Sequence, residues 1–163
     1  MLTIRPATSK DLGAITQIYN GAILNTTATF DTEIKSLEDR KNWFDGHGAA
    51  HPILVAEQDR TVIGWASLSA YSDRCAYSGT AEISLYVHKE YYRQGIGRKL
   101  TEMIIQAGRM AGLHTLIARI ACDNEVSIRL AKSVGFESVG TMREVGRKFG
   151  RLLDVEILQL LYR

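Results

Sequence analysis

One stretch of this 163-residue sequence, residues 80–110, restricts the fold more than any other. Apolar and polar residues alternate through residues 80–88, which is the period of a strand with two different faces. After a short loop, residues 95–110 carry apolar side chains at helical spacing, namely Ile96, Leu100, Met103, Ile104 and Ala107. A strand followed directly by an amphipathic helix predicts a layered domain in which the helix packs on a sheet.

The rest of the chain has the periodicities that such a domain needs. We expect further strands around Leu2 and Ile4 and at residues 53–56, 62–68, 116–121, 136–145 and 152–160. We expect helices after Thr8 and at residues 36–44 and 124–134, a loop at residues 23–33, and a basic, glycine-rich turn at residues 146–151. The order β-α-α-β-β-β-α-β-α-β-β predicts an α/β fold of the α+β type with a mixed sheet. No linker interrupts residues 1–163, which predicts a single domain.

The charge balance and the apolar segments exclude several classes of partner. The net charge is +2, from 20 Lys and Arg against 18 Asp and Glu, so nothing favours nucleic acid or an anionic membrane. The apolar stretches are too short to span a bilayer, and the first six residues do not resemble a signal peptide. Two cysteines without CxxC spacing indicate reduced thiols and a cytoplasmic protein.

The sequence offers no pattern for a metal site or a nucleophilic cysteine. The four histidines, His47, His51, His88 and His114, do not have metal-ligand spacing, so no metal is expected. No His–acid pair is suggested beside Cys122, which is interpreted as a small buried hydrophobic residue.

A glycine pair, Gly95 and Gly97, opens the helix that follows the alternating strand. Glycine lets the backbone approach a ligand closely, and the unpaired N–H groups and dipole of a helix N-terminus favour an anion. Arg93 and Arg98 add positive charge, so the loop is a candidate pyrophosphate site, although a plain helix start explains the glycines as well. A dinucleotide fingerprint would need glycine in place of Leu100, and no Walker lysine follows.

Two motifs in succession resemble the GNAT acetyltransferase superfamily. The strand–loop–GxG–helix unit matches the superfamily's motif for the CoA pyrophosphate, and residues 124–128 with residues 134–136 match its next motif. A closer resemblance, to the phosphinothricin and methionine sulfoximine acetyltransferases, is carried by residues 27–33, 73–77, 80–87 and 146–151 together with Asp154. The resemblance implies a GNAT-like acyl-CoA N-acyltransferase fold, acetyl-CoA as co-substrate, direct transfer to the α-amino group of a small amino-acid analogue, a role in antibiotic or herbicide detoxification, and a homodimer.

The resemblance also implies roles for individual residues. It makes Glu82 the general base, acting through water; the alternative is a surface glutamate on an alternating strand. The implied contacts to acetyl-CoA come from Leu85, Tyr86, Val87, Arg93, Gln94, Gly95, Ile96, Gly97, Arg98, Asn124 and Ser127. The implied acceptor pocket consists of Phe30, Arg74, Tyr77, Glu82, Ile83 and Ser84.

Several of these residues have a simpler alternative role. Asn124 begins a predicted helix and suits an N-cap, and Arg74 is either a partner for the acceptor carboxylate or a solvated loop charge. Phe30 and Tyr77 are either pocket walls or core residues. Relatives often carry Tyr or His at the position of Ala131, so a side-chain acid for the leaving thiolate is missing there.

Three functions remain open at this point. The favoured one is a small-molecule N-acetyltransferase. A non-catalytic acyl-CoA-binding sensor would keep the glycine loop without needing Glu82, and Ala131 favours it mildly. A protein N-terminal or lysine acetyltransferase would need an open peptide groove, whereas the loops at Phe30 and Arg74 favour a closed pocket.

Overall fold

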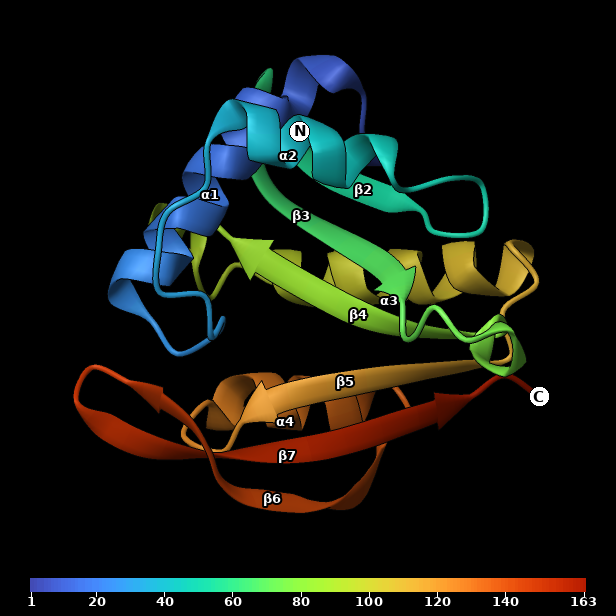
Figure 1. Ribbon diagram of the computed structural model, residues 1–163. Coiled ribbons are helices and arrows are strands. Elements are labelled where there is room, and N and C mark those ends of the chain that lie inside the picture. The colour runs from blue at the N-terminus through green and yellow to red at the C-terminus, as the bar shows by residue number, and fades with distance from the viewer.

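The computed structural model describes residues 1–163 and contains one seven-stranded sheet in the order β1-β2-β3-β4-β5-β7-β6 (Figure 1). The strands are β1 Leu2–Pro6, β2 Ile53–Gln58, β3 Thr61–Ala70, β4 Thr80–Val87, β5 Thr115–Ala121, β6 Glu137–Lys148 and β7 Arg151–Leu161. The helices are α1 Leu12–Asn25, α2 Leu37–Asp45, α3 Ile96–Met110 and α4 Glu125–Ser133. The predicted order of elements and the predicted mixed α/β fold are confirmed.

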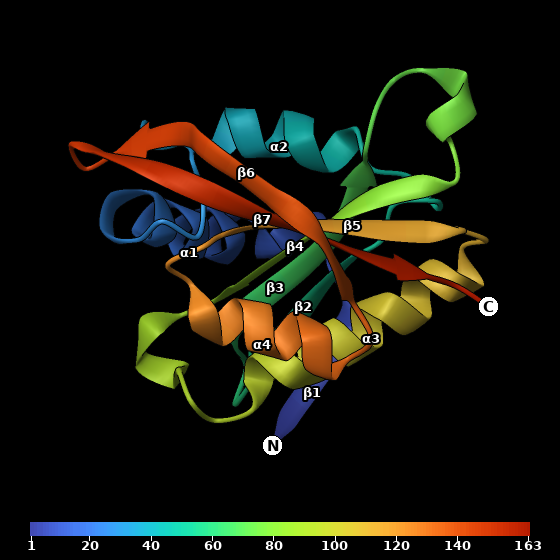
Figure 2. The same cartoon turned by 90° about the horizontal axis from the view of Figure 1, so that it is seen from below.

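Helices cover both faces of the sheet and create two separate cores. α1 and α2 lie on one face, and α3 and α4 lie on the other (Figure 2). On the first face, Trp65 of β3 packs with Ile15 and Ile23 of α1. On the second face, Leu100 and Ile104 of α3 are fully buried in a larger cluster. The alternation along β4 serves both cores, because successive side chains point to opposite faces.

The sheet divides between β4 and β5. These two strands form the only parallel pair, and their pairing stops after three residue pairs, from Thr80↔Thr115 to Glu82↔Ile117. Beyond Glu82, β4 stays paired with β3, while β5 continues with β7 and separates from β4 (Figure 1). The remainder of β4 therefore has a backbone edge without a strand partner in the middle of the sheet.

Local signals at the helix ends are observed as predicted. Ser36 and Asp39 form a reciprocal capping box at the start of α2. Gly95 is the N-cap of α3 and has φ of +79°, a left-handed conformation that glycine adopts without steric cost. Asn124 is the N-cap of α4, and Gly135 follows that helix with φ of +113°.

Three predicted details are wrong. The predicted loop at residues 23–33 begins too early, because the buried Ile23 packs against the sheet and keeps α1 helical to Asn25. The turn predicted at residues 146–151 contains only Phe149 and Gly150, because β6 and β7 stay paired to Lys148↔Arg151. Met103 is 47% exposed and lies outside the apolar stripe of α3.

The close approach of α3 to the sheet gives a stability prediction at Gly108. A Cβ atom there would overlap the Tyr162 hydroxyl and lie 2.8 Å from Leu68 Cδ1. We expect Gly108→Ala to lower the free energy of unfolding by about 1–3 kcal/mol in urea denaturation, because this core has no room for a methyl group. The matched control is Gly21→Ala in α1, where a Cβ meets nothing within 4 Å. This control should gain about 0.5–1 kcal/mol, and an equal gain at Gly108 would contradict the packing argument.

Candidate active site

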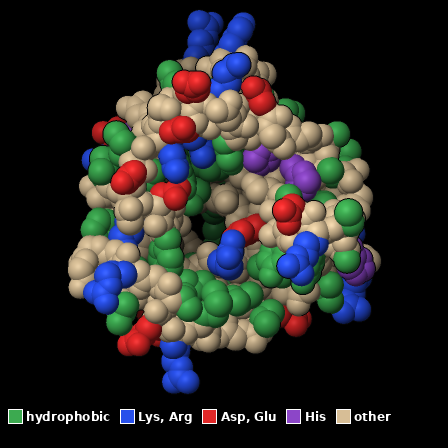
Figure 3. All heavy atoms as spheres, viewed as in Figure 1, with side chains coloured by type: hydrophobic (Ala, Val, Ile, Leu, Met, Phe, Trp, Pro, Cys, Tyr) green, Lys and Arg blue, Asp and Glu red, His purple; other side chains and the backbone are tan.

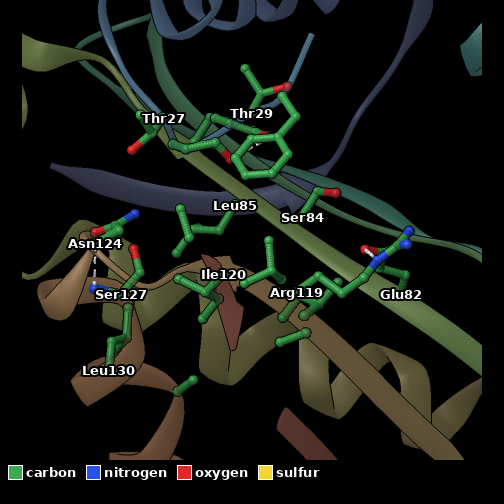
Figure 4. A pocket seen from close by; sticks show the side chains of 18 of the residues that line it. Thr27, Thr29, Glu82, Ser84, Leu85, Arg119, Ile120, Asn124, Ser127 and Leu130 are labelled. Atoms are coloured by element: carbon green, nitrogen blue, oxygen red, sulfur yellow. Dashed lines mark hydrogen bonds and ion pairs between the residues drawn. The ribbon is translucent and has the colours of Figure 1, made fainter. Parts of the chain in front are cut away.

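A cavity of about 680 Å³ occupies the space where β4 and β5 separate. Its walls come from these two strands, the loop after α1, the start of α4, and the β6–β7 hairpin (Figure 4). Figure 3 shows the hollow near the centre of one face, with acidic and basic side chains at its rim. A cavity of this size suits a small-molecule ligand.

The cavity passes through the sheet from one face to the other. Ile83 and Leu85 of β4 point to the side of α3, where they pack on the larger core. Glu82, Ser84 and Tyr86 point to the opposite side, where the Tyr86 ring lies 4.9 Å from the Trp65 ring. All five β4 residues line the same cavity, so two molecules entering from opposite faces of the sheet can meet beside β4.

On the α1–α2 side, Glu82 forms a bidentate ion pair with Arg119 of β5 (Figure 4). Arg119 Nε donates to Glu82 Oε2 at 2.7 Å, and Arg119 Nη2 donates to Oε1 at 2.6 Å. These hydrogen bonds raise the pKa of the Arg119 guanidinium, and the side chain of Glu82 is only 23% exposed. The pair places one fixed negative and one fixed positive group on the same wall.

Sequence reasoning identified Glu82 but missed Arg119. Ile117 pairs with Glu82, and Arg119 lies two residues further along β5 on the same face. The only signal was an arginine in an otherwise apolar strand, and its meaning depends on the register between β4 and β5, which is a tertiary property.

Residues 27–31 of the loop after α1 line the cavity and are here called its roof. A hydrogen-bond network holds this roof in place. The Tyr19 hydroxyl contacts the Asp31 carboxylate and lies 2.9 Å from Thr29 Oγ1. Burial raises the pKa of Tyr19 to about 12. The Tyr86 hydroxyl donates to the carbonyl oxygen of Ala28 at 3.3 Å, and burial raises its pKa as well. Both phenols therefore stay protonated and hold the loop as hydrogen-bond donors.

The β6–β7 hairpin holds the same loop from the other side. Lys148 is 5% exposed, donates from Nζ to the Thr29 carbonyl oxygen at 2.7 Å, and has a pKa lowered by burial. The Phe30 ring lies directly against the backbone of Gly146. The predicted pocket residue Phe30 thus lines the cavity as part of a roof that is fixed at both ends.

The N-terminus of α3 has the free donors that the glycine pair predicts. The backbone N–H groups of residues 94–98 donate to no group of the protein. A Cβ on Gly97 would lie 3.7 Å from Leu85 and from Leu130, two residues that line the cavity, so this helix start adjoins the cavity. Arg98 is not a free charge, since its guanidinium donates to Glu102 at 2.9 Å and to Ser133 at 3.0 Å.

The start of α4 contributes two further predicted residues. Asn124 Oδ1 accepts a hydrogen bond from the Ser127 N–H at 3.3 Å, and both residues line the cavity (Figure 4). The capping role and a ligand-binding role are therefore compatible at Asn124, because the cap uses only the side-chain oxygen. Ala131 also lines the cavity and brings no acidic group to it.

Not all predicted site residues lie at the cavity. The lining includes Phe30, Glu82, Ile83, Ser84, Leu85, Tyr86, Asn124 and Ser127, but not Arg74 or Tyr77. Arg74 and Tyr77 are exposed in the segment between β3 and β4, where the Tyr77 ring packs 5.3 Å from Tyr71. Val87 and residues 93–98 lie beyond the lining, at the α3 end of β4.

None of the helices has the length and apolar character needed to cross a membrane. No three His, Cys, Asp or Glu side chains are grouped in a way that could hold a metal ion.

Comparison with known families now identifies the fold and the reaction class. The model of the acetyltransferase (GNAT) domain matches residues 4–157. The chain belongs to the GNAT acetyltransferase family. It is an N-acetyltransferase. Its sequence is 38% identical over 160 residues to an L-methionine sulfoximine/L-methionine sulfone acetyltransferase of Salmonella typhimurium, covering 98% of this chain and 94% of the relative.

Solved structures of similar proteins support the same assignment. A Salmonella typhimurium protein with its cofactor acetyl-CoA has a TM-score of 0.96 and 38% identity, covering 99% of this chain and 94% of that one. A phosphinothricin acetyltransferase of Sinorhizobium meliloti in complex with acetyl-CoA has a TM-score of 0.94 and 34% identity, covering 98% and 88% of the two chains.

The contact between Phe30 and Gly146 gives a prediction for the roof of the cavity. A Cβ on Gly146 would overlap the Phe30 ring, which is 39% exposed, so the ring would have to move from its present position. We expect Gly146→Ala to lower kcat/KM for the acceptor on the order of tenfold, because a displaced wall misplaces the bound acceptor. Gly140→Ala on the same strand is the control, since a Cβ there meets nothing within 4 Å. Steady-state kinetics with unchanged kcat/KM in both variants would contradict a role for the roof.

Proposed function

We propose that this N-acetyltransferase transfers the acetyl group of acetyl-CoA to the α-amino group of a small amino-acid analogue of the methionine sulfoximine, methionine sulfone or phosphinothricin type. The observation that carries the proposal is the cavity that passes through the sheet, with Glu82 on one side of β4 and the start of α3 near its other end. The names of the relatives support the choice of acceptor class.

The residues around the α3 end of the cavity suit acetyl-CoA. The unpaired N–H groups of residues 94–98 would bind the pyrophosphate, helped by the positive end of the helix dipole. The unpaired edge of β4 from Leu85 to Val87 would form backbone hydrogen bonds with the amides of the pantetheine arm. Asn124 and Ser127 border the same path. The thioester would then reach the point where the cavity passes β4.

Glu82 is assigned the role of general base for direct transfer. The acceptor enters as an ammonium with a pKa of roughly 8, so a proton must leave before the nitrogen can attack. Glu82 takes this proton, directly or through a water molecule. The nitrogen then attacks the thioester carbonyl carbon, the C–N bond forms, and the C–S bond breaks. The nitrogen releases its second proton to solvent as the amide forms, and the departing CoA thiolate takes up a proton from solvent, because the side chain at Ala131 carries no acid.

The fixed roof favours a small acceptor over a peptide. Tyr19, Tyr86 and Lys148 all bond to the loop at residues 28–31, which lines the cavity together with Glu82. A peptide would need this loop to move away from three separate hydrogen-bonding partners. The proposal therefore prefers free amino-acid analogues to protein N-termini or lysines.

We infer the domain organisation, the cellular location and the oligomeric state from more general features of the chain. Residues 1–163 are proposed to form one GNAT domain, which the family match to residues 4–157 supports. A cytoplasmic location agrees with the free cysteines Cys75 and Cys122. A homodimer agrees with apolar side chains exposed on the β6–β7 hairpin, including Val139, Val145 and Phe149. We also propose a role in detoxification, which follows from the acceptor class.

The proposed acetyl-CoA site predicts that a side chain added at Gly97 weakens acetyl-CoA binding. A valine there would push methyl groups against Leu85 and Leu130, where the cavity meets the proposed phosphate site. We expect Gly97→Val to raise KM for acetyl-CoA roughly tenfold or more, with a smaller effect on KM for the acceptor. Gly48→Val, in a loop with no atom within 4 Å of a new Cβ, is the control. Thermal unfolding with and without CoA checks binding, and full stabilisation by CoA in a folded Gly97→Val protein would refute this site.

The proposed role of Glu82 as general base predicts that its substitution causes a pH-dependent loss of kcat. Glu82→Gln keeps the shape of the side chain but cannot accept a proton, so kcat should fall by about 10²–10⁴-fold while acetyl-CoA affinity stays nearly unchanged. The defect should shrink as the pH rises above roughly 8, because more of the acceptor is then already neutral. A thiol-release assay from pH 6.5 to 9.5 measures this. Near wild-type kcat at neutral pH would remove Glu82 from the mechanism.

A further inference from the structure

Arg119 lines the cavity but has no role in the transfer steps described above. It lies on β5 beside Glu82, and its side chain is 51% exposed. Of the residues that line the cavity, Arg119 is the only one with a positive charge. The other charged lining residues are Glu82 and Asp31, and Asp31 is already bonded to Tyr19.

The guanidinium of Arg119 has one edge in use and one edge free. Nε and Nη2 donate to Glu82, whereas Nη1 has no partner in the protein. Nη2 carries a second hydrogen that points along the same side as Nη1. The Nη1–Nη2 edge is therefore a fork of two parallel donors, which is the arrangement that binds a carboxylate in bidentate geometry.

The ion pair as a whole is complementary to an amino-acid zwitterion. An α-amino acid carries its ammonium and its carboxylate on one carbon atom, so its two charges need two opposite charges side by side. Glu82 and Arg119 provide this arrangement at hydrogen-bond distance from each other. The register of β4 and β5 holds both side chains on one wall, so the cost of ordering them does not fall on the acceptor.

We propose that Arg119 binds the α-carboxylate of the acceptor through its Nη1–Nη2 edge while Glu82 receives the ammonium. The proposal rests on the assignment of an amino-acid analogue as acceptor and makes Arg119 the residue that selects it. It replaces Arg74 in that role, because Arg74 is exposed in the β3–β4 segment and does not line the cavity. An amine without a neighbouring carboxylate leaves the free edge of Arg119 unpaired.

Arg119 also holds Glu82 in place, so the experiment must separate recognition of the carboxylate from an effect on the base. We would measure kcat/KM for L-methionine sulfone and for its carboxamide in the wild type, Arg119→Gln, Arg119→Lys and Arg74→Gln. The relevant quantity is the ratio of the two kcat/KM values within each protein. A change that acts only through Glu82 lowers both values together and leaves the ratio unchanged.

The expected outcome is a loss of discrimination that is large in Arg119→Gln, partial in Arg119→Lys and absent in Arg74→Gln. Arg119→Gln should reduce the acid-to-amide ratio by about tenfold or more relative to the wild type, because a charge-assisted pair is lost. Arg119→Lys should keep part of the ratio, since a point charge cannot reproduce the fork. Arg74→Gln should keep the wild-type ratio.

Two results would overturn the role of Arg119, and a third would overturn the proposed function. A wild-type ratio in Arg119→Gln removes Arg119 from acceptor recognition, and a collapse of the ratio in Arg74→Gln contradicts the replacement of Arg74 by Arg119 in that role; the acceptor class stands in both cases. If the wild type acetylates peptides or polyamines with higher kcat/KM than every amino-acid analogue, the proposed function fails together with this inference.

Discussion

The parallel pairing between β4 and β5 is short, and most of the functional architecture depends on where it stops. Three residue pairs hold the two halves of the sheet together, and the last of them includes Glu82. Had the pairing continued, the backbone edge of β4 would be consumed by β5, and no cavity would cross the sheet. The separation creates an unpaired strand edge, a passage between the two faces, and a wall on which charges from two strands meet.

An unpaired edge in the middle of a sheet is costly unless another group satisfies it. In this fold the unpaired edge of β4 borders a ligand site, and the surrounding elements limit the size of the opening. The loop at residues 26–31 covers it on one face, and α4 borders it on the other. The hydrogen bonds of Tyr19, Tyr86 and Lys148 hold this loop in the folded structure.

The parts that sequence predicted well are those determined by local rules. The alternation of residues 80–88, the glycine at the start of α3 and the Ser36–Asp39 capping box each depend on a few neighbouring residues, and each is present. The role of Glu82 came only from the family resemblance and remains a proposal. Arg119 was beyond sequence reasoning, because the meaning of that residue depends on the register of two strands far apart in the chain. The same holds for Ile23, which stays helical only because it packs against the sheet.

The position of β7 has a consequence for how the chain assembles. β7 lies between β5 and β6, so β5 has one open edge until residues 151–161 are in place. A ribosome-bound chain that ends before β7 would expose that edge and the apolar surface that Leu158 and Leu160 cover in the finished protein. Such an edge is a template for pairing with other chains. The N-terminal half can collapse earlier, since β1 to β4 pair among themselves, but the cavity wall at Arg119 gains its neighbouring strand only after residues 151–161 have been synthesised.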